Sequence, residues 1–129
     1  MVDRRPRQRS RQQRRRLSLR RCRHPADRFQ VGWTDPGDWL EYDIVVTQTG
    51  LYRVTAHVTS GCCGNLESFH LDIDGSDASG PVEFELIDDW DTLHDVVGDG
   101  IYLEAGPHRL RFVWDEVPFD LESFDLTLP

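Results

Sequence analysis

The sequence contains no lysine, and its 129 residues include only three cysteines and one methionine. It has no run approaching the roughly 18 apolar residues that a membrane-spanning helix requires. No apolar stretch follows the basic start, as it would in a secretory signal peptide, and no segment shows the hydrophobic period of an amphipathic helix. We therefore expect strands and turns, no membrane partner, and no export signal in the chain as written.

Cysteine and histidine give little indication of a metal centre. Cys62 and Cys63 are adjacent and could bridge only through a strained ring, while Cys22 lies in the N-terminal segment. A zinc site needs two ligand pairs and this chain has one, so we predict loop thiols without a role, with a redox or intermolecular bridge as the alternative. The histidines do not cluster in the sequence. We predict polar surface or strand positions rather than ligand roles for His57, His70, His94 and His108.

Charge divides the chain into two parts. Residues 1–28 carry twelve arginines and two acidic residues, a net charge of +10, whereas residues 29–129 carry three arginines and 21 acidic residues, a net charge of −18. Such an acidic surface repels nucleic acid, so we expect no nucleic-acid partner. It also repels itself, and we predict a domain adapted to a salty setting. Stability that is equal in low and in molar salt would contradict this prediction.

Residues 1–28 are predicted to lie outside the fold. Their composition is typical of a disordered basic arm for an anionic partner. A mistranslated segment or misassigned start is the other explanation, because GAC codons for Asp become CGA codons for Arg when the frame slips by two bases. An Asp-rich strand misread in this way would be rich in arginine and free of lysine, as this segment is. An acidic, strand-like continuation upstream of Phe29 in another frame of the encoding DNA would identify the artefact.

From Phe29 onward, hydrophobic residues alternate as they do in strands with one buried face. The residues predicted to face inward are Leu40, Tyr42, Ile44 and Val46; Tyr52, Val54, Ala56 and Val58; Phe69, Leu71 and Ile73; and Leu110, Phe112 and Trp114. A change of parity within Phe119–Leu128 predicts a bulge at Glu122–Ser123. About eight short strands separated by turns predict an all-β protein, an antiparallel β-sandwich of the jelly-roll type, for residues 29–129.

The turns between these strands have specific sequences. Pro36 followed by Gly37 is typical of a type II turn. Asp74-Gly75 predicts a hairpin that leads to a strand at Val82–Leu86; the acids around it resemble a calcium loop, but the glycine stands too early for an EF-hand. Two further short strands are predicted at Leu93–Val97 and Gly100–Leu103.

Trp33 and Trp39 lie on either side of the first of these turns. Alternation places Trp39 outward, on one face with Glu41 and Asp43. Aromatic rings beside acids are what a sugar-binding surface needs, because indole packs on the apolar face of a pyranose and carboxylates accept bonds from its hydroxyls. Structural packing is the alternative for both tryptophans.

Four blocks of residues occur in a fixed order along the chain. They are Trp33 with Gly37-Asp38-Trp39-Leu40-Glu41-Tyr42; Gly50-Leu51-Tyr52; Asp74-Gly75 with Trp90; and Gly106-Pro107-His108-Arg109-Leu110-Arg111 with Phe119-Asp120-Leu121-Glu122. Each block alone is weak, but their order and spacing are specific. Through these blocks, Gln30–Leu128 resembles the family 6 carbohydrate-binding modules of the family 6/35/36 β-jelly-roll group.

The resemblance implies a non-catalytic module that binds a polysaccharide or oligosaccharide and belongs to a larger, extracellular, polysaccharide-active enzyme. It implies a site at the loop end of the sandwich, where Trp33 and Trp90 clamp a sugar ring. Asp120 stands where the family has an Asn that bonds the sugar hydroxyls, and Glu122 lies nearby. A carboxylate accepts but cannot donate as an amide does, so the sugar preference is expected to differ. We expect a monomer.

The resemblance has two further implications. Some family members carry a second site on the concave sheet face, which here would use Trp39 and Glu41. The family also holds a structural Ca²⁺ through acids of its first strand, which has no counterpart in residues 1–28. We therefore expect an uncovered sheet edge and an incomplete calcium site, and we assign no metal ligand.

Two other classes of function remain open. A structural or adhesive sandwich domain would leave Trp33 and Trp90 buried. A small glycoside hydrolase or lyase would need a carboxylate pair such as Glu41 and Asp43 in a cleft. Against the enzyme, 21 acidic residues produce many chance pairs, and a surface pair lacks the burial that raises the pKa of a catalytic acid.

Overall fold

The computed structural model of the protein describes residues 2–6, 21–23, 29–32, 34–61, 66–85 and 89–128. Every regular element among them is a strand, which confirms the all-β prediction. The strands are β1 (Val2–Pro6), β2 (Arg21–Arg23), β3 (Phe29–Val31), β4 (Trp39–Val46), β5 (Gly50–Ser60), β6 (Leu66–Ile73), β7 (Ser76–Asp77), β8 (Val82–Glu85), β9 (Asp89–Leu103), β10 (Gly106–Glu116) and β11 (Asp120–Thr127). Within these ranges there is no helix long and apolar enough to cross a membrane.

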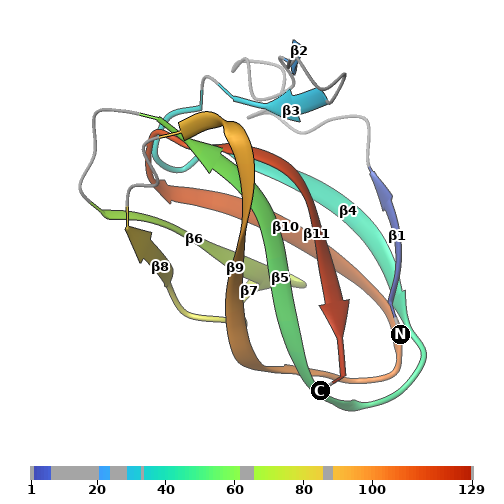
Figure 1. Ribbon diagram of the computed structural model, residues 1–129. Coiled ribbons are helices and arrows are strands. Elements are labelled where there is room, and N and C mark those ends of the chain that lie inside the picture. Colours follow the sequence, from blue (N-terminus) through green and yellow to red (C-terminus); the bar gives the residue numbers. More distant parts are fainter. Residues whose placement is uncertain are drawn as a thin grey trace.

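The strands form two antiparallel sheets that pack face to face (Figure 1). Sheet A has the order β1-β4-β10-β6-β7, and β8 also pairs with β6. Sheet B has the order β2-β3-β11-β5-β9. Strands distant in sequence are neighbours in space, as β4 and β10 are in sheet A and β5 and β11 in sheet B. This crossed order is that of a jelly roll, and the predicted β-sandwich is confirmed.

Two short strands of the N-terminal segment pair with the sandwich. β1 runs along β4 from Val2 opposite Val46 to Pro6 opposite Tyr42, and β2 pairs with β3. The edge of β4 that we expected to be uncovered therefore has a partner strand. Most of residues 1–28 lie outside the described residues, so their exclusion from the fold stays a prediction.

The core lies between the two sheets and consists of the residues that alternation placed inside. Most of this inward set is buried, and Tyr42 and Ile73 are partly buried and pack against it. The predicted bulge in β11 is present, because the pairing of β11 with β5 shifts between Leu121 and Ser123. The shift keeps Phe124 inside after Leu121, which a regular strand could not do.

Trp114 belongs to an aromatic cluster with Phe112 and Phe119 under the loop end of the sandwich. It is fully buried, as predicted. Its ring packs edge-on against Phe112, with centroids 5.0 Å apart, and stacks on Phe119 at 5.9 Å. Its indole N–H donates to the Phe119 carbonyl at 3.2 Å. The cluster thereby joins β10 of sheet A to the residue that precedes Asp120 in sheet B.

The turn at Asp35–Asp38 has the predicted type II character. The Asp38 N–H donates to the Asp35 carbonyl at 3.0 Å, and Gly37 has a φ of 93°, which favours glycine at this position. Backbone hydrogen bonds also join the turn to β10: Gly37 N–H donates to the Trp114 carbonyl, and Trp114 N–H donates to the Asp38 carbonyl. The segment that follows Trp33 is therefore anchored to the core tryptophan.

The predicted hairpin at Asp74-Gly75 is confirmed, with φ angles of 52° and 90°, but it first leads to the short strand β7, which pairs with β6. The prediction of two strands between Leu93 and Leu103 is wrong. β9 is one strand that pairs with β5 and shifts register opposite Tyr52 and Val54. The glycines at 98 and 100 suggest a turn in the sequence, whereas in the fold they accompany an irregularity within a continuous ladder.

Candidate functional site

The loop end of sheet B, at the top of Figure 1, brings four chain segments together. Strand pairing places Val31 opposite Leu121, Asp120 opposite Thr59, and Ser60 opposite Asp89. The end of β3, the start of β11, the end of β5 and the start of β9 therefore lie side by side. Trp90 of β9 and Asp120 and Glu122 of β11, three of the residues predicted to bind sugar, belong to these segments. We call this end of the sheet the loop-end site.

Asp120 lies in the middle of the loop-end site. Its carboxylate packs on Gly32, where an added methyl group would overlap it, and the residue is 8% exposed. Burial raises the pKa of Asp120 to about 6. The protonated carboxyl group has both an O–H donor and a carbonyl acceptor. Near and below that pH, Asp120 can therefore match the hydrogen bonds of the Asn that the resemblance implies.

Asp120→Asn is expected to stabilise the protein at alkaline pH. The folded pKa of about 6 exceeds the value near 3.9 of an unfolded Asp, so the folded state binds the proton more tightly. The wild type should lose stability as pH rises between these two values. The variant should therefore be more stable by about 3 kcal/mol at pH near 8 and nearly equal at pH near 4.

Urea unfolding of both proteins at the two pH values measures this difference. The matched control is Asp43→Asn, because the Asp43 side chain is 54% exposed. If the free energies of unfolding of wild type and Asp120→Asn instead differed by the same amount at both pH values, that result would contradict a buried carboxyl group with a raised pKa.

Trp90 lies at the start of β9 and is half-buried, outside the core cluster. The pyrrole side of its indole sits directly on Gly61, where a methyl group would overlap the ring. Glycine is required for such a close approach of a ring to the backbone. Trp90 therefore lies at the rim rather than in the core, and its sugar-binding role stays a prediction.

Trp33 lies outside the described residues, and its predicted role stays a prediction. Its neighbours Gly32 and Thr34 are described and buried. Gly32 follows β3 and Trp90 begins β9, and these two strands are separated by β11 and β5. Three strand spacings amount to about 14 Å, which is wide enough for a sugar ring. Glu122, the remaining predicted residue of this site, lies at the bulge of β11 and is partly exposed.

Sequence reasoning missed Glu67, which lies inside the sandwich near the loop end. It is fully buried. Burial raises the pKa of Glu67, and nearby Ser60, the residue before Gly61, lowers it by a smaller amount. Glu67 lies two residues before Phe69 in β6, so the two side chains point to the same, inward side of the strand. In the sequence, however, an acid just before the first inward hydrophobic residue is easily assigned to the preceding loop.

The second predicted site, on the outer face of sheet A, is not an open platform. Trp39 and Glu41 are only 8% and 6% exposed. The Arg111 guanidinium lies over the Trp39 ring, 3.8 Å from its centroid, and its Nε donates to Glu41 at 2.9 Å. Arg109 approaches the other Glu41 oxygen at 3.6 Å. The expected exposed aromatic face is therefore wrong, because arginines of β10 cover what alternation places outside.

A groove of about 600 Å³ lies on the same face, and its walls include Asp43, Asp74, His108, Arg109 and Arg111. Its polar groups bind one another: His108 pairs with Asp74 at 2.6 Å and with the Glu104 carbonyl at 2.7 Å. The Asp74 carboxylate raises the pKa of His108, and His108 in turn lowers the pKa of Asp74. Glu41 is bound by Arg109 and Arg111, whereas the Asp43 side chain is 54% exposed.

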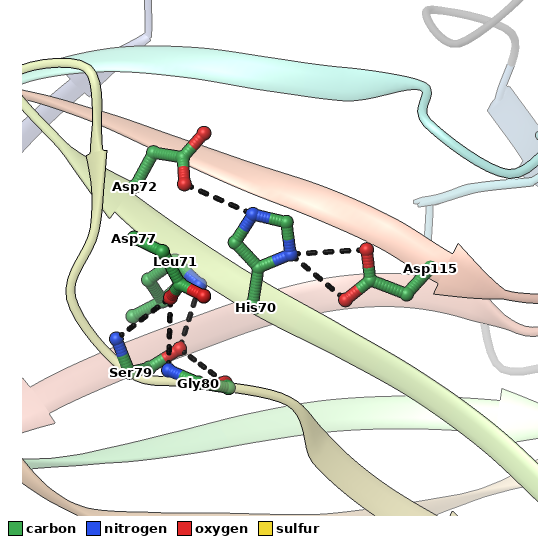
Figure 2. A network of polar contacts seen from close by, with 7 residues as sticks. All are labelled: His70, Leu71, Asp72, Asp77, Ser79, Gly80 and Asp115. Carbon is green, nitrogen blue, oxygen red and sulfur yellow. Dashed lines mark hydrogen bonds and ion pairs between the residues drawn. The ribbon is translucent and has the colours of Figure 1, made fainter.

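A second polar cluster on sheet A contains one of the histidines. His70 lies between Asp72 and Asp115, and Asp77 folds back beside them (Figure 2). Potential ligand atoms of His70, Asp72 and Asp77 lie within 4.8 Å of one another. His70 therefore occupies a polar strand position, as predicted, and strand pairing places it beside acids that are distant in the sequence.

The structural calcium implied by the resemblance stays a prediction. It would use first-strand side chains, which lie outside the described side chains, with oxygens from residues such as Asp120, Glu122 and Asp125. Asp120 is buried against Gly32, and Asp125 contacts His57 Nε2 at 3.2 Å. Where side chains are described, the one group of three potential metal donors contains none of these acids.

Comparisons with known proteins agree with this architecture. The family model for "Carbohydrate binding module (family 6)" matches residues 11–128. The chain is similar to CsCBM6-3 from Clostridium stercorarium, solved in complex with cellobiose, at a TM-score of 0.72 and 18% identity over 85% of this chain and 82% of that one. No curated protein matches.

Two further solved structures give the same fold. The C-terminal CBM6 of LamC, a marine laminarinase from Zobellia galactanivorans, has a TM-score of 0.71 and 18% identity over 84% of this chain and 87% of that one. CBM6cm-2 from Cellvibrio mixtus lichenase 5A, solved in complex with cellotriose, has a TM-score of 0.69 and 20% identity over 84% of each chain.

Proposed function

The chain belongs to carbohydrate-binding module family 6, and on that premise we propose that it binds a polysaccharide or oligosaccharide at the loop-end site without catalysing a reaction. One observation carries the placement. Strand pairing sets the half-buried Trp90, the Asp120 carboxyl group and the residue before Trp33 along one end of sheet B.

The chemistry of these residues fits a sugar ring. The apolar C–H face of a pyranose packs on the indole of Trp90, and Trp33 would close the ring from the side of β3. Asp120 lies between them and offers its carboxyl oxygens to the hydroxyls at the rim. Its partial burial strengthens such hydrogen bonds, because little water competes for them.

Several features support a binding module over an enzyme. Glu41, one of the two acids that a hydrolase would need on sheet A, is engaged by Arg109 and Arg111. The solved relatives include modules of a laminarinase and a lichenase, which supports attachment to an extracellular polysaccharide-active enzyme. In that setting the module would hold the enzyme on its substrate.

Affinity electrophoresis against a panel of soluble polysaccharides tests the proposal. The panel should contain β-1,3-glucan, mixed-linkage β-glucan, a soluble cellulose derivative and xylan. We expect at least one glycan to retard the protein and no reducing sugar to be released during prolonged incubation. Mobility unchanged by every glycan would favour a structural or adhesive domain, and release of reducing sugar would favour a hydrolase.

A further inference from the structure

A polar cluster on the outer face of sheet A is independent of the loop-end site. We call it the His70 cluster, and it consists of His70, Asp72, Asp77 and Asp115 (Figure 2). Alternation turns His70 and Asp72 of β6 away from the core. The β6–β7 hairpin places Asp77 opposite Asp72, and β10 runs along the other side of β6 and contributes Asp115.

The two ring nitrogens of His70 face different carboxylates. Nε2 lies 2.9 Å from Asp72 Oδ1, and a carboxylate oxygen of Asp72, one of Asp77 and a ring nitrogen of His70 lie within 4.8 Å of one another. Nδ1 lies 2.8 Å and 3.0 Å from the two oxygens of Asp115. A carboxylate on one nitrogen and ligand space on the other is the usual arrangement of a metal-binding histidine, because the carboxylate fixes the ring and its tautomer.

Asp77 is also held in place. Its Oδ1 accepts hydrogen bonds from the backbone N–H groups of Gly80, at 2.8 Å, and Ser79, at 3.2 Å. The carboxylate therefore does not depend on a flexible side chain alone for its position. Asp77 is exposed, whereas the side chains of His70 and Asp72 are 20% and 23% exposed, so the space between the three groups is open to solvent on one side.

Charge in the cluster is unbalanced. Three carboxylates surround one imidazole, which can neutralise at most one of them. Arg111 is the cross-strand neighbour of Asp72, but its guanidinium bonds to Glu41 and covers Trp39 on the opposite side of β10. A divalent cation at this place would supply the missing positive charge.

We propose that His70 Nε2, Asp72 and Asp77 bind one divalent transition-metal ion, with Asp115 positioning the imidazole. One nitrogen and two carboxylate ligands suit Zn²⁺ or another first-row ion, whereas Ca²⁺ and Mg²⁺ prefer oxygen ligands alone. Solvent completes the coordination on the exposed side. The bound ion would join the β6–β7 hairpin to the sheet face.

His57 provides a matched control within the same fold. It too lies between two carboxylates, with Asp95 2.7 Å from Nδ1 and Asp125 3.2 Å from Nε2. These acids lie on opposite edges of the ring and cannot both reach a metal bound to one nitrogen. A histidine between acids is therefore insufficient, and the grouping of three donor atoms within 4.8 Å of one another distinguishes His70.

Calorimetric titration with ZnCl₂ tests the proposal on the full chain. Cys22, Cys62 and Cys63 are replaced with serine to remove thiol ligands, and about 0.5 M NaCl screens diffuse binding to the acidic surface. We expect one equivalent to bind. His70→Gln and Asp77→Asn should each lower the association constant at least about tenfold, Asp115→Ala should lower it about 10- to 100-fold, and His57→Gln should leave it unchanged.

Thermal unfolding of each variant, with and without zinc, separates loss of the site from loss of the fold. The parent should gain melting temperature with zinc, while folded His70→Gln should not. The proposal is overturned if the parent binds no zinc at about 1 mM, or if His70→Gln and Asp77→Asn bind as the parent does. It is also overturned if Ca²⁺ binds as tightly as Zn²⁺, because the histidine would then contribute nothing.

Discussion

Replacing Trp114 with alanine is expected to lower the free energy of unfolding by about 3 to 5 kcal/mol, the usual cost of removing a fully buried large aromatic side chain. The ring contacts Phe112 and Phe119, and its N–H satisfies the Phe119 carbonyl. The variant would leave a cavity between the sheets and an unpaired carbonyl. Urea unfolding followed by far-ultraviolet circular dichroism measures the loss without relying on tryptophan fluorescence.

The control for this loss is Tyr102→Ala, because Tyr102 is an aromatic residue of the same sandwich that is 55% exposed. Its removal should change the free energy of unfolding by less than about 1 kcal/mol. If Trp114→Ala and Tyr102→Ala had similar effects, the aromatic cluster would not be the centre of the core.

Replacing Trp90 with alanine is expected to abolish retardation by whichever glycan binds the wild type. The stacking surface at the centre of a small binding site acts as a hot spot, and its loss costs at least about 2 kcal/mol, or about 30-fold in affinity. Because Trp90 is half-buried and rests on Gly61, the variant should remain folded. Affinity electrophoresis and circular dichroism of the same sample measure both properties.

Tyr102→Ala is again the matched control, since Tyr102 lies on the same strand, β9, near its other end. That variant should be retarded as strongly as the wild type. If Trp90→Ala still bound the glycan, sugar would not bind at the loop-end site. If both variants lost retardation equally, the effect would be a general one on the fold.

The strands could be predicted because each has one buried face. Tyr52, Val54, Ala56 and Val58 alternate strictly and are all fully buried, and the change of parity before Phe124 correctly locates the bulge. β9 could not be predicted as one strand, because Gly98 and Gly100 have the composition of a turn. Only the pairing with β5 shows that the ladder continues through them.

The candidate sites depend on contacts that alternation does not contain. A period of two gives the face on which Trp39 lies, but its cover is Arg111, which also bonds to Glu41 seventy residues earlier in the sequence. In the same way, His70 of β6 contacts Asp115 of the neighbouring strand β10. The loop-end residues were found through the resemblance to family 6 carbohydrate-binding modules. The order of its motifs along the chain identifies these positions even where the hydrophobic alternation gives no information.

Asp120 and Glu67 show a further limit of sequence reasoning. Both are acids in a chain with abundant surface acids, and nothing in their sequence neighbourhoods distinguishes buried from exposed ones. In the fold, burial raises the pKa of both carboxyl groups. The pKa values follow from the packing at the loop end, which the sequence pattern alone does not define.

The central claim is that sugar binds at the loop-end site, and a backbone amide NMR titration with an oligosaccharide of the retarding glycan tests it most directly. The account predicts that the largest shifts occur at Gly32, Gly61, Asp120 and the Trp90 indole N–H. Shifts concentrated instead at Trp39, Arg109 and Arg111, on the outer face of sheet A, would contradict it.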